Sequence, residues 1–345
     1  TGHYNYTILA SLGILVILLG LVVMAWATRR LIRTMIGVVM PGESENLSDL
    51  IFSNLQLSKG PKVVVIGGGT GLSVMLRGLK AKTYNLTAVV TVADDGGSTG
   101  RIRQDLDIIA PGDLRNCLVA LADKEGLMEK LFAHRFGGSG NLTGHSFGNL
   151  FIAALIEVLG DVEAMDATSK VLRVRGKVIP SSAEKIRLNA EMTDGRIVEG
   201  ESQIPHAHGK IKRVFTTPEH PKAIQSAVRA IQEADAIVLG PGSLYTSIMP
   251  NLCVPDIVQA VRTSKATKIY ICNVMTQPGE TDDYTVSDHV KAINRQAGGR
   301  VIDFVLANNG DVDPAVLQRY VATGSHPVII DKKEVSQAGA TLILS

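Results

Sequence analysis

A run of glycines after a short apolar stretch is the first feature of this sequence that could do chemistry. Residues 63–66 are all β-branched, and the residues that follow them are Gly67, Gly68, Gly69, Thr70 and Gly71. Glycines after a buried strand let the backbone approach a diphosphate, and the next helix N-terminus supplies N–H donors and a positive dipole. Leu72 replaces the last glycine of G-x-G-x-x-G, and no lysine follows as in a Walker A motif. We therefore predict phosphate binding, without assigning NAD or ATP; a plain tight turn is the alternative.

Two adjacent carboxylates end the next apolar run. Asp94 and Asp95 follow residues 86–92, and glycines, Ser98, Arg101 and Arg103 come after them. In α/β folds, ligands bind at the carboxyl ends of strands. There a carboxylate can hold a ribose or a hydrated Mg²⁺, the glycines and Ser98 can form a backbone nest for phosphate, and the arginines can balance diphosphate charge. The alternative is a helix N-cap followed by a solvated basic helix.

Two further polar motifs carry weaker signals. Asp113 fits the N-cap of the helix that follows it. His145 and Asn149 lie in a glycine-containing motif before an apolar helix, where ligand-binding and structural interpretations of the histidine stay equally open. His206 and His208 are two residues apart beside a proline, a spacing that does not favour zinc.

A second glycine turn follows a later apolar run at residues 236–239. The residues that we assign to a ligand here are Gly240, Gly242 and Ser243, and Asn251 follows close by. Such a turn suits a second phosphate, a sugar or a base. Several strand ends with small polar turns are stronger evidence than any one motif. The chain has no nucleophilic cysteine paired with a histidine motif and no kinase signature, so neither of these kinds of catalysis is indicated.

The elements that must position these motifs form βαβ units. Strand, glycine loop, helix and a strand that ends in acid predict a Rossmann-like, doubly wound, mainly parallel α/β sheet. The further strands are expected at residues 236–239, 268–272 and 301–306. Residues 170–216 are predicted to form an antiparallel β insert, because residues 171–178 alternate and an Asp194-Gly195 turn separates two strand-like runs.

The N-terminus predicts one transmembrane helix. Residues 7–28 contain no charge, Trp26 lies near the end of this stretch, and three arginines follow. About 20 apolar residues span a hydrocarbon core of roughly 30 Å, and the positive-inside rule places the rest of the chain in the cytoplasm. The alternatives are a signal peptide, for which a basic n-region is missing, and a core helix. The expected segments are an extracytoplasmic tail (1–6), the membrane helix (7–28), a juxtamembrane linker (29–61) and a ligand-binding domain (62–345).

Composition excludes several classes of protein. Of 345 residues, 45% are hydrophobic and 20% charged, which is too apolar for a disordered chain. The 35 basic and 33 acidic residues nearly cancel, so nucleic-acid binding is not expected. Three cysteines without a C-x-x-C pair fit reduced thiols. The mean hydropathy of +0.18 comes mostly from residues 7–28.

These motifs together resemble the YvcK-like gluconeogenesis factors, which share a superfamily with the CofD phospholactate transferases. The segments that carry the resemblance are residues 63–79, 90–103, 111–120, 144–150, 237–252 and 270–280. The resemblance implies binding of UDP-sugars, chiefly UDP-N-acetylglucosamine, at the C-terminal edge of the sheet. It also implies a regulator of cell shape and cell-wall precursor supply, not a catalyst. Thr70 and Asn251 match family residues associated with nucleotide-sugar binding.

The resemblance also bears on cofactors and partners. It implies no required cofactor, with Mg²⁺ accompanying the nucleotide diphosphate and Asp94 and Asp95 as the only candidate ligands. It implies contact with an amino-sugar synthesis enzyme and self-association. The alternative is a CofD-type transferase, which moves a phospholactyl group from a guanosine diphosphate-linked donor to a deazaflavin with Mg²⁺. The transferases share the glycine loop and the Asp pair, whereas residues 96–100 and 240–250 resemble the regulators.

Overall fold

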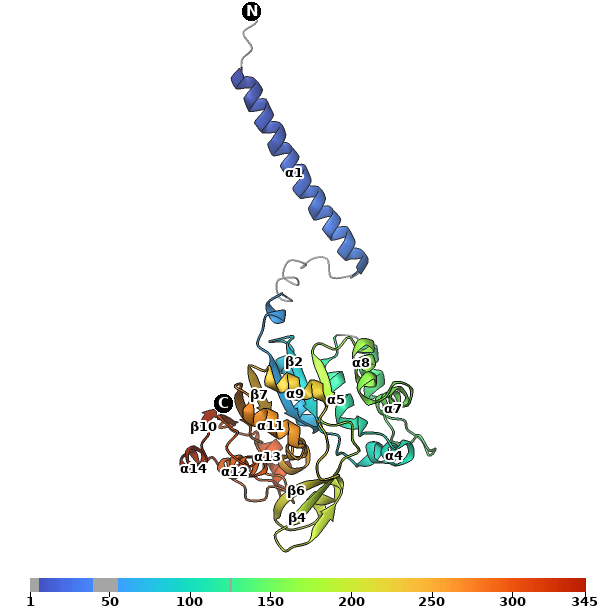
Figure 1. Cartoon of the computed structure of the whole chain (residues 1–345), viewed down its shortest axis with the longest axis vertical. Coiled ribbons are helices and arrows are strands. Elements are labelled where there is room, and N and C mark those ends of the chain that lie inside the picture. Colours follow the sequence, from blue (N-terminus) through green and yellow to red (C-terminus); the bar gives the residue numbers. More distant parts are fainter. Residues whose placement is uncertain (1–5, 40–54, 124–125) are drawn as a thin grey trace, which may run out of the picture. The chain divides into compact units, whose positions relative to one another are not determined.

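The computed structural model describes residues 6–39, 55–123 and 126–345, and the chain divides into two units, Thr1–Gln56 and Leu57–Ser345 (Figure 1). In the first unit, helix α1 (Tyr6–Val39) contains an exposed apolar stretch, Ile8–Leu31, that is long enough to cross a membrane. Helix α1 therefore continues past residue 28 into the predicted juxtamembrane linker, because arginine is a good helix former.

The second unit begins earlier than the predicted residue 62. Residues 55–58 form one helical turn, and the Leu57 carbonyl accepts hydrogen bonds from the backbone N–H groups of Gly60 and Tyr84. The sequence also predicts one short amphipathic turn or helix within residues 47–57, most of which lie outside the described residues.

A seven-stranded parallel sheet forms the centre of the second unit, as predicted. Its strand order is β10-β9-β8-β7-β1-β2-β3. The strands are β1 (Val63–Gly67), β2 (Leu86–Val90), β3 (Lys177–Pro180), β7 (Ala236–Leu239), β8 (Thr267–Ile271), β9 (Phe304–Ala307) and β10 (Thr341–Leu344). Strand β1 is buried along its whole length and pairs with β2 on one side and β7 on the other. An uninterrupted β-branched run is typical of such a central strand.

The strand order reverses beside β1. The chain adds β2 and β3 outward on one side, then returns to place β7 against the other edge of β1 and continues outward to β10. In open α/β sheets, the crevice at such a switch point is where ligands bind, outside the carboxyl ends of the strands. The two glycine turns follow β1 and β7, so both lie at this switch point.

Helices cover the sheet. Those before β7 are α3 (Gly69–Leu79), α4 (Gly97–Leu106), α5 (Pro111–Leu121), α6 (Gly126–Ala133), α7 (Phe147–Leu159), α8 (Asp161–Val171) and α9 (Gln225–Gln232). Those after β7 are α10 (Met249–Leu252), α11 (Pro255–Thr263), α12 (Val286–Gln296), α13 (Pro314–Val321) and α14 (Lys332–Gln337). Amphipathic spacing fixes their inner faces: Leu72 and Leu76, one turn apart on α3, are both fully buried.

An antiparallel sheet interrupts the parallel one, and β4 and β6 extend from one end of the domain (Figure 1). Its order is β5-β4-β6, with β4 (Arg187–Met192), β5 (Ile197–Glu199) and β6 (Ile211–Thr217). The Asp194-Gly195 turn joins β4 to β5 as expected, and Gly195 has a φ of 88°, which glycine adopts without strain.

The predicted start of this insert is wrong. Helix α8 runs to Val171, and β3, which includes Val178 and Ile179, pairs in parallel with β2 as an edge strand of the main sheet. The alternation of polar and apolar residues in 171–178 was misleading because the polar position Arg175 has specific partners. Its guanidinium donates hydrogen bonds to the Asp123 carboxylate and the Tyr84 hydroxyl.

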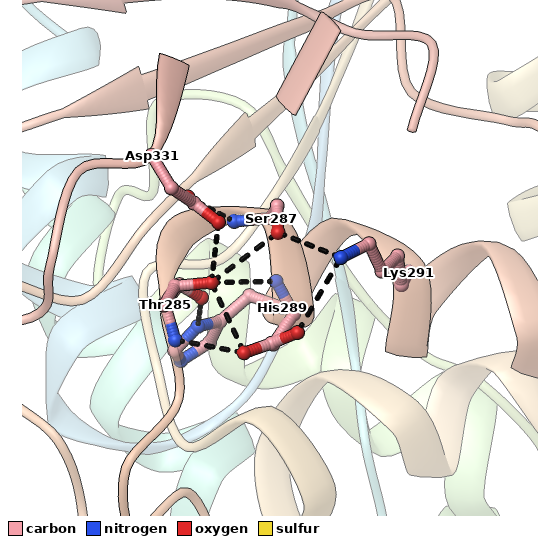
Figure 2. Close-up of polar contacts among 6 residues, drawn as sticks. Thr285, Ser287, His289, Lys291 and Asp331 are labelled. Atoms are coloured by element: carbon pink, nitrogen blue, oxygen red, sulfur yellow. Dashed lines mark hydrogen bonds and ion pairs between the residues drawn. The ribbon is translucent and has the colours of Figure 1, made fainter. Parts of the chain in front are cut away.

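A polar network fixes the N-terminus of α12 (Figure 2). The Thr285 hydroxyl and the Asp288 carboxylate form a capping box, and the Asp331 carboxylate accepts from the Thr285 hydroxyl at 2.7 Å and the Ser287 N–H at 2.9 Å. His289 is fully buried, with Nδ1 2.8 Å from the Thr285 carbonyl oxygen. Helix α12 is thereby anchored to the segment before α14.

Candidate functional site

The two glycine turns touch each other backbone to backbone. A Cβ at Gly71 would lie 3.1 Å from the Pro241 carbonyl oxygen, and a Cβ at Gly242 would lie 3.2 Å from that of Gly68. Gly69 and Gly240 have φ values of 70° and 81°, which side chains rarely adopt. The structure therefore brings together the glycines predicted from both turns, and packing explains why no larger residue occupies these positions.

The start of α3 presents backbone N–H groups and the Thr70 side chain. Its N-cap, Gly68, offers no side-chain cap, so N–H groups of the first turn depend on other acceptors. The Thr70 side chain is exposed at this end of the helix. A hydroxyl and backbone N–H groups at a helix N-terminus are suited to phosphate oxygens.

Asp113 reaches this helix end, which sequence reasoning did not foresee. Helix α5 begins at Pro111 with Ala110 as its N-cap, so the predicted N-cap role of Asp113 is wrong. The Asp113 carboxylate instead lies against the backbone at the start of α3, where a Cβ at Gly68 would be 2.5 Å from its Oδ2. Burial, with the nearby Asp94 charge, raises the pKa of Asp113 to about 6.

The adjacent carboxylates after β2 point to different partners. Asp94 Oδ1 accepts the Gly96 N–H at 2.9 Å, while Asp95 Oδ1 accepts the Ser202 N–H at 2.9 Å and so holds the 3₁₀ helix Glu201–His206 of the insert. Asp94 faces the start of α5, where a Cβ at Gly112 would lie 2.9 Å from its other oxygen. Asp94 and Asp95 thus join the edge of the sheet to the insert, and they do not form a single site with two carboxylate ligands.

Glu201 completes an acidic group that the sequence did not reveal. Burial raises its pKa to about 8, with further contributions from Asp94, Asp95 and Asp113. No group of three or more His, Cys, Asp or Glu side chains in the described ranges is arranged to hold a metal ion. These carboxylates could complete a Mg²⁺ site only with oxygens from a ligand, which is how Mg²⁺ often binds beside phosphates.

Ser98, His145 and Asn149 come together as a buried trio. Ser98 Oγ lies 3.2 Å from His145 Nδ1 and accepts from Asn149 Nδ2 at 3.2 Å. Since Ser98 then has its own proton to give, His145 Nδ1 is best placed to accept it. Burial lowers the pKa of His145, which fits a neutral ring.

The two arginines after the Asp pair differ in their roles. Arg103 donates from Nη1 to the Ala93 and Asp94 carbonyl oxygens and from Nη2 to that of Ile186, so its side chain holds the acidic loop against the insert. Arg101 is exposed and donates to the Thr143 carbonyl oxygen at 2.8 Å. Arg101 is therefore the more available of the two for an anionic ligand.

Asn251 lies behind the glycine loop. It is fully buried, and its Nδ2 donates to the carbonyl oxygens of Gly67 at 3.2 Å and Ser247 at 2.9 Å. Its Oδ1 has no hydrogen-bond partner in the part of the chain that is described. This geometry fits a residue that positions the loop, and direct contact with a ligand stays a prediction.

Glu280 and Asn273 support the second turn from the next strand, and neither was singled out from the sequence. The second turn leads into a π-helix, Leu244–Ile248, whose N-cap residue is Ser243. At the start of this helix, the Glu280 carboxylate accepts hydrogen bonds from the Tyr245 N–H at 3.1 Å and the Thr246 hydroxyl at 3.0 Å. Burial raises the pKa of Glu280 to about 7. Asn273 Nδ2 donates to the Gly242 carbonyl oxygen at 2.9 Å.

The chain is similar to known proteins in sequence and in structure. The family model for the 2-phospho-L-lactate transferase CofD matches residues 63–345. The gluconeogenesis factor of Bacillus subtilis is 52% identical over 288 residues, which cover 83% of this chain and 91% of that protein. The chain belongs to the gluconeogenesis factor family. Within the wider CofD family, a solved Bacillus halodurans structure of the UPF0052 family matches with a TM-score of 0.81 and 51% identity, over 83% of this chain and 92% of that one.

One family member bears on the N-terminal unit. A gluconeogenesis factor relative from Nostoc sp. is 52% identical over 335 residues, covering 96% of this chain and 74% of that protein. Residues 1–56 are far more than the 4% left unmatched, so this match must extend into the N-terminal unit. That relative therefore matches part of the N-terminal unit as well as the second unit.

Proposed function

We propose that this gluconeogenesis factor is a membrane-tethered regulator that binds a UDP-sugar, chiefly UDP-N-acetylglucosamine. The observation that supports it is the contact between the glycine turns after β1 and β7 at the switch point of the sheet. Two open backbone turns side by side suit the two phosphates of a nucleotide diphosphate. As a regulator it would influence cell shape and cell-wall precursor supply.

The electrostatics of the site support a ligand that brings a counterion. Asp94, Asp113 and Glu201 face the same edge as the glycine loop, and a diphosphate there would meet their negative charge. Either protonation of these carboxylates or a Mg²⁺ ion carried by the ligand removes the repulsion. Thr70 and the first-turn N–H groups of α3 would hold the phosphate oxygens, while Arg101 would balance part of their charge.

Binding is tested by calorimetry on Leu57–Ser345 with UDP-N-acetylglucosamine, with and without Mg²⁺. Gly71→Val should abolish binding, because its side chain would push the Pro241 carbonyl and the second turn away. Gly78→Val is the matched control on the same helix, since a Cβ there meets nothing within 4 Å. Equal binding by both variants would contradict the proposed site.

A CofD-type transferase is the second candidate, because the matching family model carries that description. The same calorimeter distinguishes the two functions. Clear heat with a guanosine diphosphate ligand and none with UDP-sugars would reject the regulator, and product formation with a deazaflavin acceptor would support the transferase.

We infer membrane tethering from the exposed apolar stretch of α1 and the arginines after it, with the second unit cytoplasmic. A cleaved signal sequence passes the same test of length and hydropathy. Retention of the segment in the mature protein, read by mass spectrometry of the membrane fraction, supports the anchor, and its removal contradicts it.

A further inference from the structure

A small cavity of about 290 Å³ lies where the insert meets α10 and α12. Its inner wall is apolar: Val214, Tyr245, Met249 and Ala292 line it and are all buried. None of the residues that we assigned to the glycine edge lines this cavity. Ligand pockets usually measure roughly 300–1,000 Å³ and have apolar walls with a few polar groups, so this one suits a small occupant.

The rim of the cavity is positively charged. Lys212 and Arg213 both bind the Glu191 carboxylate, each at 2.6 Å, so that two cations share one anion. The side chain of the third cation, Arg295, makes no hydrogen bond or ion pair in the described part of the chain, and the residue is exposed. Three positive charges and one negative charge surround an apolar floor, and this complements an anion with an apolar body.

Arg295 is presented from a fixed support. It lies in the last turn of α12, whose N-terminus is anchored by the Thr285 and Asp331 network (Figure 2). The helix is also packed by its buried face, which includes Val290 and Ile293. A guanidinium on an anchored helix is a better recognition group than a surface arginine on a loop, because only the side chain must be ordered.

One short segment joins the cavity to the glycine turns. Tyr245 and Met249 line the cavity, whereas Ser247 and Asn251 approach the glycine loop from the same stretch of chain. Residues two apart on a helix point about 200° away from each other, so the two faces are nearly opposite. The stretch contains the π-helix, a form that often marks functional sites.

We propose that this cavity binds a small organic anion, a carboxylate on an aromatic or compact apolar body, and that the occupant acts on the glycine turns through residues 244–252. The carboxylate pairs with Arg295 at the rim, and the apolar body rests on Tyr245 and Met249. Filling the cavity restrains the segment from one face, which changes the mobility of the glycine loop on the other.

The test uses the full chain in detergent micelles and 3-phenylpropionate as the probe, with empty micelles as the blank. 3-Phenylpropanamide has the same shape without the charge and should bind at least tenfold more weakly. Arg295→Ala should weaken binding of the acid by about tenfold, and Arg295→Lys should restore part of it. The matched control is Arg319→Ala, which removes an exposed arginine from the last turn of α13.

Each result decides one part of the proposal. Equal affinity for acid and amide, or acid binding that Arg295→Ala leaves unchanged, overturns the recognition. Hydrogen exchange in peptides that contain residues 63–79 and 240–252 should slow when the probe binds, and unchanged exchange overturns the coupling. No nucleotide sugar is present in either measurement, so both results are independent of the proposed function.

Discussion

Glu201→Gln should stabilise the folded domain at pH 8 and have little effect at pH 5. The side chain is largely buried beside Asp94, Asp95 and Asp113, and no hydrogen bond to its carboxylate is among the described contacts. Glutamine has nearly the same shape but carries no charge. The substitution therefore removes the unfavourable charge and leaves the packing in place.

The magnitude follows from the pKa difference. The folded-state pKa is about 8 and the ordinary value is 4.5, so the folded state binds more protons between these limits. Stability contributed by this group is therefore present below pH 4.5 and lost as the pH rises toward 8. At 1.36 kcal/mol per pKa unit, the full loss is about 5 kcal/mol, and relaxation of neighbouring carboxylates and solvent reduces it to roughly half. At pH 5 the same relation gives a loss of stability of about 1 kcal/mol or less.

The assay is urea unfolding of Leu57–Ser345, followed by circular dichroism because the only tryptophan, Trp26, lies outside this unit. The midpoint of Glu201→Gln should exceed that of the wild type at pH 8, and the two midpoints should converge at pH 5. Glu199→Gln is the control: this insert glutamate is exposed and paired with Arg187, so its loss should lower stability by less than about 1 kcal/mol. A gain of equal size at both pH values, or a loss at pH 8, would refute the electrostatic reasoning.

Three further predictions concern ligand binding, loop support and topology. Thr70→Ala should weaken UDP-N-acetylglucosamine binding by about tenfold through one lost hydrogen bond to a charged group, while Thr70→Ser retains it by calorimetry. Asn251→Ala should lower the unfolding free energy by about 1–3 kcal/mol, since it leaves the buried Gly67 and Ser247 carbonyl groups without this donor, and should also weaken binding. Unchanged stability would argue against its role as a loop support. A thiol-reactive probe added outside cells should label an engineered cysteine near Thr1 but not one near Lys62, and the reverse pattern would overturn the predicted orientation.

Much of the sheet was predictable because local sequence patterns identify several of its strands. The β-branched run of β1 and the glycines after it leave little choice but a buried strand followed by a helix, and the same logic located β2 and β7. Residues 171–178 misled the prediction because they alternate although only Lys177 and Val178 of this run belong to a strand, β3. The pairing of β3 with β2 depends on contacts between residues about 90 positions apart, which no local pattern contains.

The site was predictable in its backbone and less so in its charges. Glycines indicate turns, so the sequence predicted the glycine turns after both β1 and β7. Asp113 was taken for an N-cap since helix starts favour that residue, whereas the backbone that its carboxylate approaches, at Gly68, lies far away in the sequence. Glu201 carries no motif at all; its raised pKa arises only when the insert folds back over Asp94 and Asp95. Asn251 was found through family resemblance, and only the structure shows that it faces the loop from behind.

The position of Asp113 beside the start of α3 has a consequence for selectivity. The helix end that would receive a phosphate already faces a carboxyl group of the protein's own. A ligand must displace that carboxylate or coexist with it, so a small anion with few contact points, such as acetate or inorganic phosphate, gains little by entering. The domain would thereby ignore the abundant small anions of its surroundings and respond to ligands with several contact points. Acidification, which protonates Asp113, would relax this discrimination.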